Sequence, residues 1–402
     1  MQTMYLDTSY GRIVTLEQRV LEERYGKLRR IMAQRGLSML FVAAPDIGGY
    51  RPYLTGSCNL DRFSTGGILL GLKGMAYLVR GDGTFDGNEC KNDNQYRAAI
   101  QEIPYRYIET NGFDAHTLRQ ILNGNHAIGI IHKRALRSSL RDYFVSLGVE
   151  RLEDLTFPAD EAKMEKSLEE LEALCAQANS LERALRGMEA AIVPGITDWE
   201  VANSFRHCQY RLGGYGNDNG ISSDIRVQVN ADGYGTYNGG MRYPGKYLQR
   251  GDRLNVSAIC VGTDSCYGSI SRCYVVGKEP DFRLEALWNV AVDAQKAAVK
   301  ALNVGSTLRK AAQCANQRIE AHGCVNANPN WFIHGIGWGM RERPFLTDES
   351  KDWPLKKGCT LVVAPEILSP DGERICCGDV FVVREDRAVQ IGSEPQMLRA
   401  IG

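Results

Sequence analysis

The sequence lacks the charge imbalance and the long apolar runs that mark several classes of protein. Among its 402 residues, Lys and Arg together number 48 and Asp and Glu together number 48, so the formal net charge is zero. No basic excess of the kind found in nucleic-acid-binding proteins is present, and no polybasic cluster suits an anionic membrane surface. Apolar runs such as 37–44 and 127–131 are far shorter than a membrane span. We therefore expect neither a nucleic-acid partner nor a membrane partner.

A regular cysteine framework is also missing. The twelve cysteines show no disulfide-like spacing and include no C-x-x-C pair, which argues against the common structural zinc sites. Residues 1–10 lack the apolar core of a signal peptide. In a chain of this length, the pattern fits a reducing compartment, and we expect a cytoplasmic protein.

The first part of the chain reads as a mixed α/β unit. Apolar residues recur at helical spacing over 14–35 and Gly36 follows them, which predicts a helix and its end. The next segments predict a buried strand at 37–44, a hairpin over 66–80, a strand at 127–131 and a helix at 135–147. Pro158 is a plausible boundary, so we expect one domain at 1–158 and a second at 159–402.

The second part alternates long helices with groups of strands. A long charged helix is predicted over 162–191, and Asp198 is the expected N-cap of the next helix. Alternating apolar and polar residues predict antiparallel strands within 224–277. Further helices are expected at 282–303 and 306–322, and further strands at 331–337, 359–366 and 379–383.

The segment 331–344, W-F-I-H-G-I-G-W-G-M-R-E-R-P, is the most informative stretch of the chain. His334 follows an apolar run that reads as a strand. Gly335 and Gly337 come directly after it and allow backbone or ligand to approach the imidazole closely. Taken alone, such a histidine is more often a core residue at the end of a strand, and the motifs around it favour a functional role.

Ordered motifs in the second part resemble those of the creatinase/aminopeptidase P/methionine aminopeptidase family. They are K-M-E-K-S-L-E-E-L at 163–171, V-P-G-I-T-D-W-E-V at 193–201, G-D-R-L-N-V-S at 251–257, S-I-S-R-C-Y-V-V-G at 269–277, H-G-I-G-W-G-M-R-E-R-P at 334–344, A-P-E at 364–366 and G-D-V-F-V-V at 378–383. The resemblance implies an α+β pita-bread domain preceded by a smaller mixed α/β domain. It also implies a homodimer.

The same resemblance indicates that most of the metal ligands are gone. Metalloenzymes of the family hold two divalent ions with two Asp, one His and two Glu, because hard carboxylates bridge such ions. His334 and Glu366 match two of these positions. Ser257, or alternatively Ala258, stands at the first Asp, and Ser269 stands at the second.

The remaining positions also depart from the family pattern. Cys376 and Cys377 stand where the last Glu is expected, and Arg341 replaces a second family histidine. Tyr237 or Asn238 replaces a third histidine, upstream of the 251–257 motif. We therefore expect no metal ion and no other cofactor.

These residues lead to the prediction of a metal-independent, creatinase-like enzyme. It would act on a C–N or related bond of a small amidine, amide or amino-acid-like molecule. His334 would be the general acid/base, with a pKa near neutral, beside Glu366. Arg341 and Arg343 would bind an anionic group. The predicted wall of the pocket consists of Tyr237, Ser257, Ser269 and the cysteine pair, with Cys377 as a substrate contact.

Two alternatives stay open, and one group of residues is expected to act across a dimer. The chain could be a catalytically inactive binding protein of this fold. It could instead be an Xaa-Pro-type peptidase with reassigned ligands, such as one zinc ion on His334, Glu366 and Cys377. Members of the creatinase branch lend N-terminal residues to the partner's pocket, and Asp61, Arg62 and Phe63 are the corresponding candidates.

Overall fold

The computed structural model describes most of the chain and divides it into two compact units, Met1–Lys163 and Met164–Gly402. The described residues are 5–8, 11–14, 18–43, 48–55, 67–73, 77–79, 106–108, 122, 124, 126–136, 138–212, 223–230, 236–237, 240–241, 245–262 and 265–402.

The first unit is built on a six-stranded sheet in the order β6-β5-β4-β3-β7-β8. Its central strands β3, β4 and β7 are buried along their whole length, as expected for an apolar sheet covered on both faces. The elements are β1 (Tyr5–Thr8), β2 (Gly11–Val14), α1 (Gln18–Gln34), β3 (Met39–Ala43), α2 (Tyr50–Thr55), β4 (Gly67–Gly71), β5 (Tyr77–Val79), β6 (Arg106–Ile108), β7 (Ala127–Ile131), η3 (Lys133–Ala135), α5 (Ser138–Ser146), β8 (Arg151–Asp154) and α6 (Thr156–Met164).

The second unit begins with two helices that cover one face of a four-stranded sheet in the order β22-β13-β12-β9. Apolar side chains from α7 and α8 pack with the apolar face of β9, β12 and β13 in one core cluster. The elements of this half are α7 (Leu168–Glu189), α8 (Asp198–Arg211), β9 (Ser223–Val229), β10 (Thr236–Tyr237), β11 (Gly240–Met241), β12 (Arg253–Val261), β13 (Tyr267–Val276) and β22 (Arg399–Ile401).

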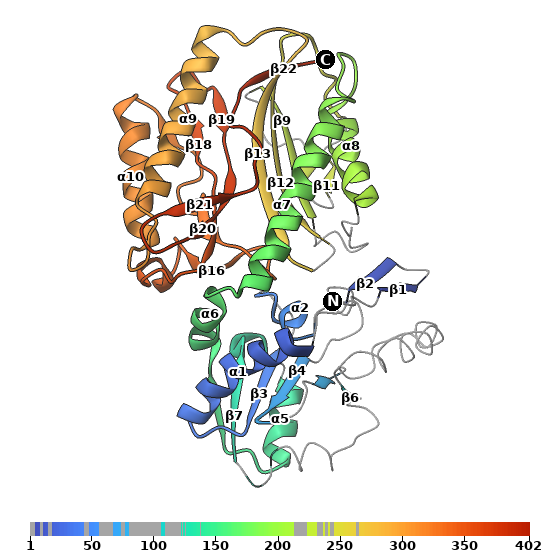
Figure 1. The fold of residues 1–402 in the computed structure, drawn as a ribbon, viewed down its shortest axis with the longest axis vertical. Helices are drawn as coiled ribbons and strands as arrows, with labels where there is room; N and C mark the ends of the chain where they lie inside the picture. The colour runs from blue at the N-terminus through green and yellow to red at the C-terminus, as the bar shows by residue number, and fades with distance from the viewer. Residues whose placement is uncertain are drawn as a thin grey trace. The chain divides into compact units, whose positions relative to one another are not determined.

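The other half of this unit repeats the plan with different strands. Helices α9 and α10 pack on a five-stranded sheet, β16-β15-β17-β20-β21, and on a three-stranded sheet, β14-β18-β19. In Figure 1 these helices flank one side of the strands, whereas α7 and α8 flank the other. The elements are α9 (Phe282–Lys300), α10 (Leu308–Ala321), β14 (Val325–Asn326), β15 (Ile333–Gly335), β16 (Glu342–Phe345), η4 (Glu349–Asp352), β17 (Thr360–Val363), β18 (Glu366–Leu368), β19 (Arg374–Cys376), β20 (Asp379–Val383) and β21 (Ala388–Ile391).

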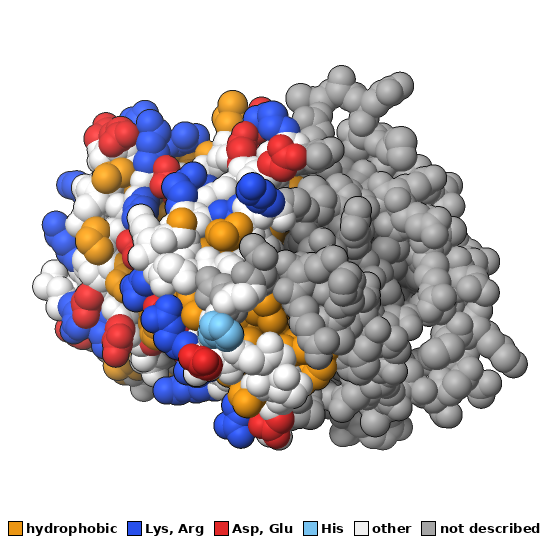
Figure 2. All heavy atoms as spheres, turned by 90° about the horizontal axis from the view of Figure 1, so that it is seen from below, with side chains coloured by type: hydrophobic (Ala, Val, Ile, Leu, Met, Phe, Trp, Pro, Cys, Tyr) orange, Lys and Arg blue, Asp and Glu red, His pale blue; other side chains and the backbone are white. Residues whose placement is uncertain are grey.

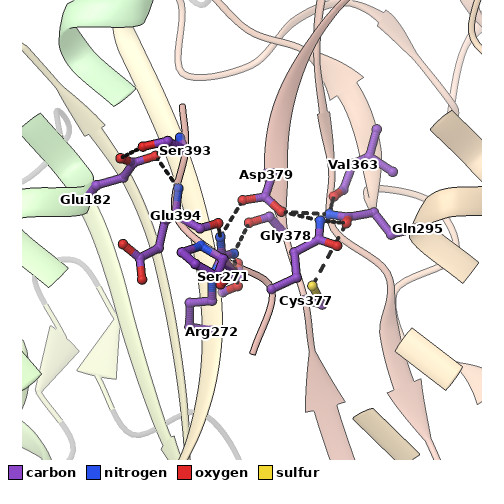
Figure 3. Close-up of polar contacts among 12 residues, drawn as sticks. Glu182, Ser271, Arg272, Gln295, Val363, Cys377, Gly378, Asp379, Ser393 and Glu394 are labelled. Atoms are coloured by element: carbon purple, nitrogen blue, oxygen red, sulfur yellow. Dashed lines mark hydrogen bonds and ion pairs between the residues drawn. The ribbon is translucent and has the colours of Figure 1, made fainter. Parts of the chain in front are cut away.

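The buried guanidinium of Arg272 connects the two halves. All five of its N–H donors have acceptors: Asp379 Oδ1 at 2.7 Å and the carbonyl oxygens of Ser271, Gly378, Glu394 and Pro395 at 2.8–3.1 Å. Figure 3 shows this side chain between β13 and the strand that carries Asp379. Ser271 and Gly378 also form a backbone bridge. The junction is therefore a hydrogen-bonded contact that is closed to water.

Two predicted helix boundaries need correction. The helix expected over 162–191 is two helices, α6 and α7. The second begins at Leu168, after the N-cap Ser167, whose hydroxyl accepts from the Glu170 N–H while the Glu170 carboxylate accepts from the Ser167 N–H. At the next helix the N-cap is Thr197, paired in the same way with Glu200, and Asp198 is the first helical residue.

Charge is mixed on the described part of the surface seen in Figure 2, where acidic and basic side chains alternate without a gathering of one sign. Among the described helices, none is long and apolar enough to cross a bilayer.

Candidate functional site

The strand β9 has one polar face and one apolar face. Asp224, Arg226 and Gln228 alternate with Ile225, Val227 and Val229, and the three apolar side chains belong to the core under α7 and α8. Because side chains on a strand point alternately to opposite faces, the three polar residues point away from that core. They line a pocket on the other face of the sheet.

Strand pairing extends this polar face in rows. Arg226 pairs with Ser257, which pairs with Ser271, and the next row holds Asp224, Ile259 and Ser269. Ser257 and Ser269 therefore both line the pocket. The sequence had predicted these two serines as part of its wall. Ala258 is buried in the opposite core, so the alternative match for the first Asp lies on the wrong face of the strand.

The opposite wall comes from the second half of the unit. His334 on β15 and Val362 on β17 are register partners, and Glu366 on β18 pairs with Cys376 on β19. Pocket residues that complete this wall are Asn328, Trp331, Arg341 and Ala364. The site is thus assembled from residues that lie far apart in the sequence, from Asp224 on β9 to Cys376 on β19.

His334 is buried and its imidazole has a fixed hydrogen-bond partner. The Nδ1 atom lies 2.9 Å from the carbonyl oxygen of Gly335, so Nδ1 carries the proton and Nε2 carries the lone pair. The pKa of His334 is lowered to about 4, mainly by burial, and the nearby Arg341 charge acts in the same direction. The imidazole is neutral at pH 7, so the expected pKa near neutrality is wrong because desolvation outweighs the hydrogen bond.

Glu366 and Cys376 are neighbours on paired strands, but neither is prepared to bind a cation. Glu366 Oε1 accepts a hydrogen bond from Arg374 Nη1 at 3.0 Å. The pKa of the Cys376 thiol is raised to about 12, mainly by burial, and the Glu366 charge acts in the same direction. Cys376 is therefore a neutral thiol at physiological pH, whereas metal ions bind the thiolate.

The pocket residues do not fit the pair of divalent ions used by metalloenzymes of this fold. The serine hydroxyls at 257 and 269 are weak ligands, and Glu366 is already paired with an arginine. The guanidinium groups of Arg226 and Arg341 also line the pocket and repel cations. Within the described residues no group of three or more His, Cys, Asp or Glu side chains could hold a metal ion.

Two predicted site residues point elsewhere. Cys377, the residue directly after β19, is buried in the core under α9, with its sulfur 4.0 Å from Gln295 Oε1. The zinc site predicted on His334, Glu366 and Cys377 therefore cannot form. Arg343 forms an ion pair with Asp348 at 2.8 Å and does not line the pocket.

The remaining predictions cannot be placed. Tyr237 lies on β10, whose side chains are not described, and Asp61, Arg62 and Phe63 lie outside the described residues.

Several pocket residues were not predicted as site residues from the sequence, notably Asp224, Arg226 and Gln228, and also Asn255 and Trp331, which lie inside segments singled out for other residues. The signal that could have found the first three is the strict alternation D-I-R-V-Q-V at 224–229. It places three polar side chains on one face of a strand, and only the neighbouring strands show that this face is a pocket.

A comparison with family profiles matches residues 173–392 to metallopeptidase family M24. Among curated proteins, an Xaa-Pro dipeptidase from Pyrococcus furiosus is 21% identical over 374 residues, covering 92% of this chain and 98% of the relative. The similarity therefore extends over both units.

Solved structures of the same kind share the fold. An X-Pro aminopeptidase from Thermotoga maritima superposes with a TM-score of 0.74 at 18% identity, covering 94% of this chain and 99% of that one. The dipeptidase PepE from Mycobacterium ulcerans gives a TM-score of 0.73 at 20% identity, covering 96% and 99%. The predicted pita-bread fold is confirmed.

The prediction of a metal-independent, creatinase-like enzyme is wrong. The relatives found are named as dipeptidases and Xaa-Pro peptidases, that is, as peptide hydrolases. The prediction was argued from the residues at the expected metal-ligand positions. Those residues bear on whether the pocket binds a cation, and they do not identify the substrate.

Proposed function

Because this chain belongs to metallopeptidase family M24, we propose that it is an Xaa-Pro-type peptidase whose pocket accepts short peptides. One observation supports this most directly. Every residue that lines the pocket, from Asp224 to Cys376, lies within the matched residues 173–392. The pocket is therefore part of the domain that the peptidase relatives share.

The pocket wall that carries Arg341 and Trp331 suits the proline end of such a peptide. Arg341 Cζ lies 5.0 Å from the ring centroid of Trp331, so a cation and a broad apolar surface stand together. We assign Arg341 to the substrate carboxylate and Trp331 to the proline ring. The bond before proline has no N–H, so the apolar side chains of Val362 and Ala364 leave no donor unsatisfied.

Hydrolysis of the Xaa-Pro bond is the first candidate activity, as in the names of the relatives. In this role the neutral imidazole of His334 offers Nε2 as a hydrogen-bond acceptor within the pocket. Since the residues present do not fit a pair of ions, no metal-assisted step is assigned to them.

Binding without hydrolysis is the second candidate, and the ligand positions favour it. Serine stands at two positions where the family places carboxylates, and the retained Glu366 is held by Arg374. A pocket of this kind can keep the shape that recognises a peptide after losing the groups that cleave it.

The test measures binding and cleavage separately. We expect Ala-Pro to bind in calorimetry, and we expect Arg341→Gln to weaken that binding about tenfold or more, because a charge-assisted hydrogen bond contributes about 1.5–3 kcal/mol. Arg318→Gln, on the exposed face of α10, is the matched control and should leave the affinity unchanged.

Release of free proline, assayed with and without added Mn²⁺, Co²⁺ or Zn²⁺, separates the two candidates. Proline release supports hydrolysis, and binding with no release under any condition supports the second candidate. Failure of Ala-Pro, Gly-Pro and Leu-Pro to bind would overturn the proposed function.

A further inference from the structure

Asp224 has a buried carboxylate oxygen that no described residue satisfies. The residue is only 6% exposed and lines the pocket. Its Oδ2 atom accepts two hydrogen bonds from Arg226, from Nε at 3.0 Å and from Nη2 at 2.8 Å. Its Oδ1 atom is buried and accepts none among the described residues.

A buried carboxylate oxygen without a donor is costly. Leaving such an acceptor unsatisfied costs about 1–3 kcal/mol, and more when the group is charged. Arg226 does not remove this cost, because both of its hydrogen bonds to the carboxylate go to the same oxygen. The position therefore suits a donor that arrives with a ligand.

We propose that Asp224 binds the protonated amino terminus of a short peptide through Oδ1, while Arg341 binds the carboxylate at the other end. This inference rests on the proposed function and assigns the orientation of the peptide in the pocket. The two charged groups come from opposite walls, Asp224 from β9 and Arg341 from the segment after β15.

An ammonium group fits this position better than a metal ion does. A divalent ion needs several anionic or imidazole ligands, and no cluster of three such groups exists among the described residues. An ammonium carries one charge and three donors, which one carboxylate oxygen and neutral hydroxyls can accept. Ser257 and Ser269 supply hydroxyls on the same face of the sheet as Asp224.

The first measurement uses the wild-type protein and two probes, Ala-Pro and N-acetyl-Ala-Pro. Acetylation removes the charge and two of the donors at the amino end and leaves the proline end unchanged. We expect calorimetry to show at least about tenfold weaker binding of the acetylated peptide. Equal affinities for the two peptides would overturn the inference and leave the proposed function standing.

The second measurement compares variants. Asp224→Asn keeps the shape of the side chain and should weaken the binding of Ala-Pro about tenfold while leaving the binding of N-acetyl-Ala-Pro unchanged. Glu320→Gln, which removes an exposed acid from α10, should change neither affinity.

The acetylated probe separates recognition from a merely structural role, because a distorted pocket would lose affinity for both peptides. Equal losses for the two peptides in Asp224→Asn would therefore overturn the assignment of Asp224. If the wild-type protein binds neither peptide, the proposed function fails, and this inference fails with it.

Discussion

At the scale of single residues, His334 shows how burial decides the chemistry of a side chain. Its imidazole keeps one hydrogen bond, to Gly335, which favours the charged form, but desolvation dominates and lowers its pKa to about 4. In the unfolded chain an exposed histidine has a pKa of about 6.5. The unfolded state therefore binds a proton between these two values while the folded state does not.

This difference predicts a dependence of stability on pH. Since the unfolded state binds more protons between pH 4 and pH 6.5, the free energy of unfolding falls as pH is lowered through that window, and His334 contributes a loss of about 2 kcal/mol between pH 7 and pH 5. Urea unfolding at the two pH values measures the loss. His334→Gln should lose about 2 kcal/mol less than the wild type, and equal losses would contradict the low pKa.

At the scale of elements, a buried ion pair holds the start of α7 to the strand β16. Lys166 Nζ lies 2.9 Å from Glu342 Oε2, and both side chains are nearly inaccessible to solvent. The other carboxylate oxygen accepts from the Gly339 N–H at 2.7 Å. A Cβ atom on Gly337 would lie 2.9 Å from Glu342 Oε2, so the glycine makes room for the pair.

Breaking this pair from one side should destabilise the second unit strongly. Lys166→Met and Glu342→Gln should each lower the free energy of unfolding by about 3–5 kcal/mol. Each change removes one member of a buried ion pair and leaves the other member buried. The double variant should cost less than the sum of the two, and chemical unfolding of all four proteins gives the coupling energy. Additive losses would show that the two side chains do not interact.

At the scale of the whole molecule, the two halves of the second unit meet at a buried junction around Arg272. Arg272 binds Asp379, and Asp379 Oδ2 also accepts from Gln295 at 3.2 Å and from Gln396 at 2.9 Å. Glu182 on α7 accepts from the backbone of Ser393 and Glu394, which fixes the segment before β22 (Figure 3). Loss of the Arg272 guanidinium would leave buried acceptors on both sides of the junction without their donor.

The five tryptophans make this junction measurable, because all of them lie in the second unit. Arg272→Met leaves Asp379 buried without its cation and should lower the free energy of the tryptophan-monitored transition by about 3–5 kcal/mol. Arg309→Met removes an exposed ion pair with Asp352 and should leave the free energy of this transition nearly unchanged. Similar losses in the two variants would contradict a central role for the junction.

Most of the elements followed from local patterns in the sequence. The helices expected at 282–303 and 306–322 are α9 and α10, and the apolar run at 127–131 is β7 at those bounds. The division of the long charged helix was missed, because its cap at Ser167 competes with strong helix-forming neighbours. These patterns involve residues that are close together in the sequence, so they can be read without knowledge of the tertiary structure.

The sequence by itself determined the family and the identity of His334, Glu366 and the serines at 257 and 269, since motifs preserve order and identity along the chain. Only the tertiary structure decided which side chains meet. Strand pairing placed Cys376 opposite Glu366 in the pocket, while Cys377 is buried in the core under α9. Pairing also brought Asp224 opposite Arg341 and enclosed His334 far enough to remove its charge. The physical reason is that strand register and burial depend on contacts between distant segments, and a linear sequence does not contain those distances.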